Sequence, residues 1–246
     1  MNTPFVVAII FLLISRLIYL FNDDAQELKE CLTMCFIQIV GLTLFRLGIN
    51  WFLLLMVWMG LNALFFCWEN RSQRINELRL LSLALNLILL SLFFSDRIHL
   101  TFNDGVLALL SGLKHYSQLW AFMQTINAEN AGLIILGLLF IINEVNLMIR
   151  STFSIFDLVP KMNTEAQQVD RQEYNAGRVI GILERIIIFI VVLYNQFSVI
   201  GFILAAKGIT RFRELEKRKF AEYVLIGTLL SSMLALLSAL MVRAHL

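Results

Sequence analysis

Long runs of residues without a charge dominate this sequence. Tyr223–Val242 is one such run, and Trp51–Trp68 is another. A helix needs about 20 apolar residues to cross a bilayer, within a range of about 17–25. Hydrophobic residues make up 59 % of the 246 residues and charged residues 15 %, against about 45–50 % and about 25 % in soluble domains. This excess is too large for a soluble core. It predicts an all-α protein embedded in lipid and excludes a soluble enzyme or a free nucleic-acid binder.

The apolar runs predict a polytopic helical membrane protein with six to seven membrane segments. The other segments are expected at Pro4–Phe21, Cys31–Leu47, Leu80–Ser95, Ala131–Ile149 and 179–206. The stretch 100–130 carries several charges, so we expect it to form interfacial helices. The expected domains are an N-terminal membrane region, 1–130, and a C-terminal membrane module, 131–246. The first segment has no basic start and no small-residue cleavage site, so we expect it to stay attached.

The segment 179–206 decides the topology, because it can cross once or fold back. A single crossing by Ile186–Ala206 would be about 31 Å long, which fits the hydrocarbon core. It would place about nine Lys and Arg residues inside and about ten outside. A re-entrant helical hairpin, with its tip at Asn195–Gln196 near the midplane, would place about fifteen inside and about four outside. Basic residues favour cytoplasmic loops, so the hairpin is the preferred prediction and the single crossing is the alternative.

Polar side chains within the apolar segments form the first set of candidate site residues. A charge at the centre of a span costs about 2.5–3.5 kcal/mol, so each one needs a partner or a purpose. One expectation is a structural Glu144–Arg16 pair. The alternatives are a proton or ion step at Glu144 and an Arg16 side chain that reaches to the interface. The candidates are Arg16, Asn86, Asn143, Glu144, Asn146, Asn195 and Gln196.

A charge cluster at the predicted cytoplasmic edge forms the second set. Glu184 and Arg185 are adjacent, so on a helix they point in different directions and need partners on other segments. We expect Glu184 to pair with Lys207 and Arg185 to pair with Glu222. The cluster is either an ion-pair lattice that fixes helix packing or a pocket for an anionic ligand or lipid headgroup. Its members are Glu184, Arg185, Lys207, Arg211 and Glu222.

Small residues that recur every four positions predict close helix–helix contacts. The faces are Gly227, Ser231, Ala235 and Ala239 in the last segment, and Gly177 with Gly181 and Gly201 with Ala205 around the hairpin. Such faces pack either within a subunit or between subunits. We expect a homo-oligomer or a partner membrane protein, and packing within one subunit is the alternative.

Residues from about 141 to 241 resemble a known family. The matching motifs are Asn143-Glu144-Val145-Asn146, Glu173-Tyr174-Asn175-Ala176-Gly177-Arg178, Gly181-Ile182-Leu183-Glu184-Arg185, Ile200-Gly201-Phe202, Ala205-Ala206-Lys207, Arg211-Phe212, Ala221-Glu222-Tyr223 and Ile226-Gly227-Thr228. Together they resemble the C-terminal membrane part of a bacterial integral-membrane family, the domain-of-unknown-function 3307 family. The resemblance implies a multi-pass protein of the bacterial cytoplasmic (inner) membrane. It implies no activity.

The sequence contains no G-x-S-x-G, H-E-x-x-H or Walker motif. Cys31 and Cys35 share a helix face, but no His or Cys is spaced to complete a metal site, so neither metal nor cofactor is expected. We therefore predict a non-enzymatic helical membrane module that acts as a scaffold, partner subunit or membrane effector. Its expected partners are the lipid bilayer and anionic lipid headgroups, and not nucleic acid. The alternatives are a small transporter or ion channel that uses the intramembrane Glu, Asn and Gln side chains, and a membrane-embedded enzyme that acts on lipid at Glu184 and Arg185.

Overall fold

The computed structural model describes residues 3–98, 100–106, 108, 128–156, 171–210 and 218–246. Within these ranges the secondary structure is helical, which confirms the predicted all-α class. In this part of the chain, five helices are long and apolar enough to cross a membrane: Thr3–Leu20, Ile49–Glu69, Ile75–Phe93, Asn130–Ile155 and Ala221–Arg243. The expected interfacial helices near 100–130 lie mostly outside the described residues. The chain divides into two compact units, Met1–Leu139 and Phe140–Leu246.

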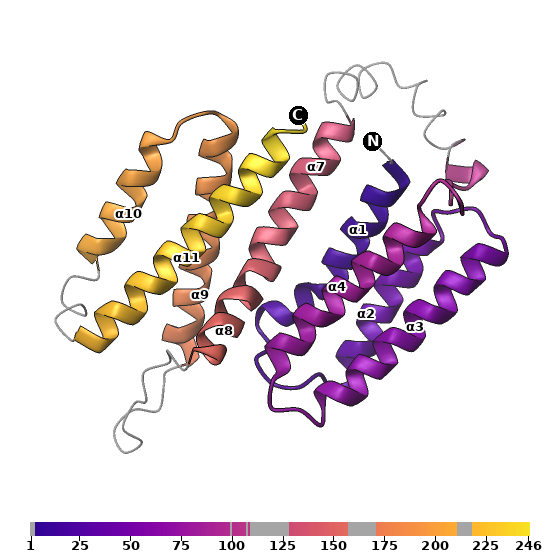
Figure 1. Ribbon diagram of the computed structural model, residues 1–246, viewed down its shortest axis with the longest axis horizontal. Coiled ribbons are helices and arrows are strands. Elements are labelled where there is room, and N and C mark those ends of the chain that lie inside the picture. The colour runs from indigo at the N-terminus through magenta and orange to yellow at the C-terminus, as the bar shows by residue number, and fades with distance from the viewer. Residues whose placement is uncertain (1–2, 99, 107, 109–127, 157–170, 211–217) are drawn as a thin grey trace. The chain divides into compact units, whose positions relative to one another are not determined.

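Unit 1 is a bundle of helices (Figure 1). It contains α1 (Thr3–Arg16), η1 (Leu17–Leu20), α2 (Leu28–Leu42), α3 (Ile49–Glu69), α4 (Ile75–Phe93) and α7 (Ala128–Leu139). Helix α1 packs against α2, α4 and α7, and α3 packs against α2 and α4. The sequence suggested a boundary after residue 130, but α7 belongs to unit 1 because it packs against α1.

Helix α2 is shorter than the predicted segment Cys31–Leu47. It covers Leu28–Leu42, 15 residues, and is not among the five long apolar helices of the described chain. Its start is set by a capping box in which the backbone N–H of Glu27 donates to the Glu30 carboxylate at 3.0 Å. Because of this hydrogen bonding, the helix starts before the apolar run, beside the acidic residues Glu27 and Glu30.

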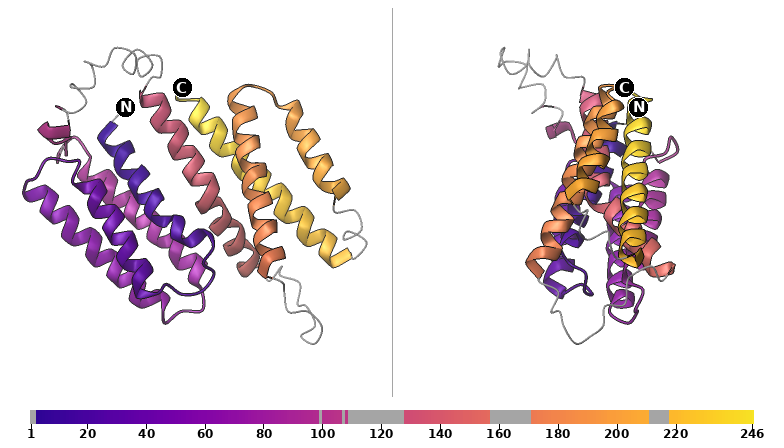
Figure 2. Two further views of the ribbon diagram at one scale, coloured as in Figure 1. Left: turned by 180° about the vertical axis from the view of Figure 1, so that it is seen from behind. Right: turned by 90° about the vertical axis from the view of Figure 1, so that its left-hand side faces the viewer.

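Unit 2 contains a π-helical turn, η3 (Phe140–Glu144), and four helices in its described residues. The helices are α8 (Val145–Ile155), α9 (Arg171–Leu193), α10 (Ser198–Thr210) and α11 (Arg218–Arg243). Helix α11 packs most extensively against α9 and also contacts α8 and η3, and α10 packs against α9. Helices α9 and α10 are antiparallel, as the left view of Figure 2 shows.

The chain reverses between α9 and α10, with Asn195–Gln196 in the connecting turn. Asn195 has a φ of 61°, and Asn is one of the few non-glycine residues that adopt this left-handed conformation readily. Helix α9 begins at Arg171, and its 23 residues are about 34 Å long. The turn lies at the end of unit 2 where α11 also ends (Figure 1). The depth of the tip in the membrane stays a prediction.

The small-residue face of α11 is buried within the chain. Ala235 and Ala239 are fully buried and Ser231 is 8 % exposed. A Cβ atom on Gly227 would lie 3.0 Å from the Cζ atom of Phe153. This face therefore packs inside one subunit, as the alternative reading of the pattern stated. A homo-oligomer stays a prediction that this face does not support.

The second predicted face, Gly201 with Ala205, points outward from α10. Both residues are exposed, and a Cβ atom on Gly201 would meet nothing within 4 Å. Among the described residues, this face makes no close helix contact within the subunit.

Candidate functional site

A polar cavity of 170 Å³ lies in unit 2, with walls from α8, α9, α10 and α11. Among the described residues that line it there are three cations and no carboxylate. The cations are Arg178 and Arg185 of α9 and Lys207 of α10. Arg178 is 9 % exposed and Arg185 is 3 % exposed. The cavity therefore lies beside two buried arginines and the partly exposed Lys207.

Two glycines of α9, Gly177 and Gly181, help to keep this space open. The sequence predicts that they pack closely against a neighbouring helix, but both line the polar cavity. A Cβ atom on Gly181 would lie 3.6 Å from Nη1 of Arg185 and would touch no other part of the structure within 4 Å. Gly181 therefore lines a cavity and makes no close helix–helix contact.

Arg185 forms the polar wall of the cavity. Its Nε atom donates to the carbonyl oxygen of Ile141 at 2.9 Å, and Nη1 donates to Oγ of Ser231 at 3.3 Å. The predicted pairing with Glu222 is wrong, because these groups on η3 and α11 are the partners instead. Ile141 belongs to the π-helical turn, a local structure that occurs often at functional sites.

Two buried hydrogen-bond donors at this cavity have no acceptor in the described chain. They are Nη2 of Arg185 and Nδ2 of Asn146, and both residues line the polar cavity. Buried polar groups are nearly always hydrogen-bonded, and one left unsatisfied costs about 1–3 kcal/mol. Both of these unsatisfied atoms are donors.

Lys207 and Glu184 form the ion pair that the sequence predicts. Lys207 Nζ lies 2.5 Å from Glu184 Oε2, and the two side chains are 16 % and 17 % exposed. The guanidinium group of Arg185 is attracted electrostatically by Glu184 and repelled by Arg150. Arg211, the remaining basic member of the predicted cluster, lies outside the described residues.

Asn143 and Glu144 occupy the π-helical turn and are buried, at 1 % and 0 % exposure. Nδ2 of Asn143 donates to Oε1 of Glu144 at 3.0 Å, while Oδ1 of Asn143 has no hydrogen-bond partner in the described chain. The predicted pairing of Glu144 with Arg16 would join the two units, and it stays a prediction. Asn195 and Gln196, the other residues of the predicted polar pathway in unit 2, are exposed at the tip of the hairpin.

Unit 1 contains a buried ionic network around Arg79. The sequence predicted that the helix starts at Leu80, which placed Arg79 in the preceding loop. Helix α4 begins at Ile75, and Arg79 is 1 % exposed. Arg79 pairs with Glu69 at 2.5 Å and donates to the carbonyl oxygens of Asn22 and Asp24, both at 2.7 Å. Arg16, a predicted candidate, donates to the carbonyl oxygen of Arg79 at 2.8 Å. The network joins three helix ends and the loop after η1.

A polar layer crosses the same unit, and the sequence pointed only to its last member, Asn86. Nε2 of Gln38 donates to Oγ of Ser15 at 3.0 Å, and Nδ2 of Asn62 donates to Oε1 of Gln38 at 2.5 Å. Asn86 donates to the carbonyl oxygen of Ser82 at 2.7 Å. The contacts of Gln38 join α1, α2 and α3 and explain their polar residues without a ligand. Asn86 instead bonds within its own helix, α4, and its Oδ1 atom has no hydrogen-bond partner in the described chain.

No family model, curated protein or solved structure matches this chain. The resemblance to the domain-of-unknown-function 3307 family stays a prediction.

Proposed function

We propose that this chain is a multi-pass helical membrane protein whose unit 2 binds an anionic group in the polar cavity, as a binding module and not as an enzyme. The observation that carries the proposal is Nη2 of Arg185, a buried and charged donor without a partner in the described chain. A buried charge is tolerated when it is paired and hydrogen-bonded. An anion in the cavity supplies both the missing acceptor and the opposite charge.

The shape of the guanidinium group favours oxyanions as ligands. Arginine presents its donors in a planar fork that fits two oxygens of a phosphate or a carboxylate. Nε and Nη1 of Arg185 are held by Ile141 and Ser231, so the orientation of the side chain is set before an anion binds. Nδ2 of Asn146 offers a second neutral donor. This arrangement suits a phosphate better than a halide.

Inorganic phosphate is the direct probe. In a maltoside detergent, phosphate should raise the unfolding temperature of the wild-type protein above that in chloride at equal ionic strength. A ligand that binds only the folded state stabilises it by about 2.7 kcal/mol when its concentration is a hundred times Kd. The proposal fails if phosphate, sulfate and acetate all leave the unfolding temperature unchanged.

Asn146→Asp sharpens this test, because the carboxylate has nearly the same shape as the amide and replaces a donor of the polar cavity with a negative charge. We expect this variant to lose the response to phosphate and to be at least as stable as the wild type without phosphate. Asn70→Asp is the matched control, since Asn70 is exposed at the end of α3. It should keep the full response.

A transporter or ion channel is the second candidate function, and the π-helical turn favours it. Glu144 is fully buried in that turn beside Asn143, and buried ionisable residues in membrane segments often mark ion or proton pathways. Liposomes that contain the wild-type protein should then show proton or cation flux, and Glu144→Gln should reduce it at least tenfold. Absence of wild-type flux would leave only the binding module.

We also propose that the basic loops lie on the cytoplasmic side of a bacterial inner membrane, because this placement follows the positive-inside rule. In a variant without Cys31, Cys35 and Cys67, single cysteines at Ser72 and Thr210 should react with a membrane-impermeant reagent from the same side. A cysteine at Asn195 should react from the other side if α9 and α10 both cross, and from neither side if the hairpin is re-entrant. Labelling of Ser72 and Thr210 from opposite sides contradicts the topology.

A further inference from the structure

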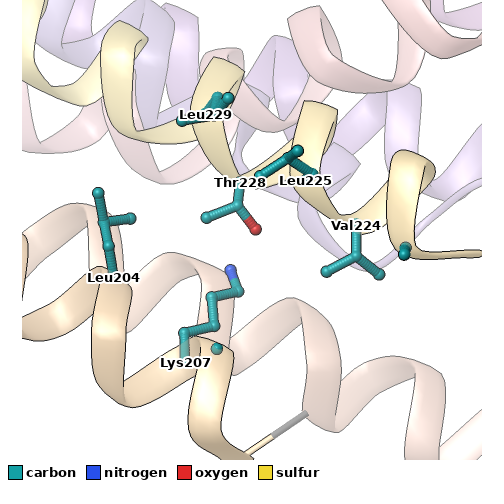
Figure 3. Close-up of a pocket in the computed structure, with 8 residues that line it drawn as sticks. Leu204, Lys207, Val224, Leu225, Thr228 and Leu229 are labelled. Atoms are coloured by element: carbon teal, nitrogen blue, oxygen red, sulfur yellow. The ribbon is translucent and has the colours of Figure 1, made fainter. Parts of the chain in front are cut away.

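A second cavity adjoins the polar cavity, in the space between α10 and α11. Its volume is 260 Å³. Lys207, Val224 and Thr228 line both cavities. The other lining residues in the described chain are all apolar, namely Leu204, Gly208, Ala221, Leu225 and Leu229. Figure 3 shows Lys207 reaching from α10 toward α11, with its nitrogen beside Thr228, Leu204 on one side and Val224 on the other.

This apolar cavity opens at the surface of unit 2. Gly208 is exposed, and Leu225 is 59 % exposed. A Cβ atom on Gly208 would meet nothing within 4 Å. The surface of a membrane-spanning segment faces lipid, so an apolar occupant can enter this cavity sideways from the bilayer.

We propose that the ligand of unit 2 is a membrane lipid with an anionic phosphate headgroup. The phosphate binds in the polar cavity at Arg185, and an acyl chain lies in the apolar cavity between α10 and α11. This assignment depends on the anion binding proposed above and adds the chemical class of the ligand. One amphiphilic molecule supplies an acceptor for the two unsatisfied donors and the apolar group that fits the second cavity.

Charge supports a lipid bound in this orientation. Arg178 and Arg185 line only the polar cavity, and the leucines line only the apolar cavity. Lys207 stands at the junction, with its ammonium group held by Glu184. Basic pockets between helices at a cytoplasmic membrane edge are a known type of site for anionic lipid headgroups.

The two glycines of α10 provide a variant and a matched control. Gly208→Leu adds a side chain at a residue that lines the apolar cavity, and the Cβ atom of that side chain would meet nothing within 4 Å. Gly201→Leu makes the same substitution in the same helix, also in open space, at a position that lines neither cavity. Both changes improve the helix propensity equally, so a difference between them reports on the cavity.

Methyl phosphate and butyl phosphate are suitable probes, since both dissolve in water and carry the same headgroup. Each methylene that leaves water for the apolar cavity should strengthen binding about fourfold. The three additional carbons of butyl phosphate should lower Kd about sixtyfold for the wild type and for Gly201→Leu. Gly208→Leu should bind both esters with equal Kd, and its binding of methyl phosphate shows that the variant is folded.

Native mass spectrometry tests the lipid directly. The wild-type protein and Gly201→Leu should retain phosphatidylglycerol after extraction, and Gly208→Leu should lose it. Equal Kd values of the two esters for the wild type, or equal retention of phosphatidylglycerol by both glycine variants, would overturn the lipid assignment and leave anion binding intact. Failure of the wild type to bind either ester would overturn anion binding itself.

Discussion

Removal of the Arg79 side chain should destabilise unit 1 strongly. Arg79→Met leaves the carboxylate of Glu69, which is 3 % exposed, without its cation. The carbonyl oxygens of Asn22 and Asp24 also lose their charged donor. Breaking a buried ion pair from one side costs about 3–5 kcal/mol. We expect Arg79→Met to lower the free energy of unfolding by this amount.

A double-mutant cycle separates the pair from the cost of an unpaired charge. Glu69→Leu alone should be about as damaging as Arg79→Met, while the double variant should lose less than the sum, because no buried charge is left alone. Equilibrium unfolding in mixed micelles of a maltoside and dodecyl sulfate measures all three. Arg74→Met is the control. Arg74 meets Glu77 at 3.7 Å with 80 % of its side chain exposed, so its loss should change the free energy by less than about 1 kcal/mol. Strictly additive effects, or an Arg79→Met variant as stable as Arg74→Met, would refute a coupled buried pair.

Two further changes test the packing of unit 2. Gly227→Leu should cause aggregation in size-exclusion chromatography, because a side chain there meets the ring of Phe153, whereas Gly201→Leu should elute as the wild type does. A Gly227→Leu protein that elutes as a folded, smaller particle would instead indicate a contact between subunits. Glu184→Ala and Lys207→Ala should each lower the unfolding temperature, and Glu184→Lys combined with Lys207→Glu should recover part of the loss; a swap that recovers nothing would argue against a direct ion pair.

The class of the fold and the position of the chain reversal follow from local sequence. Uncharged runs of membrane length report directly on helices in lipid, because backbone groups must be hydrogen-bonded within each segment there. The reversal at Asn195–Gln196 and the Glu184–Lys207 ion pair were also predictable. Their spacing around a tip depends only on helix rise and antiparallel geometry. The Glu69–Arg79 pair could have been found in the same way, since these residues flank one short loop.

The partners of Arg185 and the two cavities required the tertiary structure. Spacing along one helix gives the side of that helix on which a residue lies, but not the helix that faces it or the space left between them. The π-helical turn carries the carbonyl oxygen of Ile141 that accepts from Arg185, and the sequence pattern did not predict this turn. Gly181 and Gly227 show the same difference. Both belong to small-residue patterns in the sequence, yet Gly227 lies close to Phe153 while Gly181 lines an open cavity. The pattern shows only that one face of a helix has small side chains. The packing between helices decides what lies against that face.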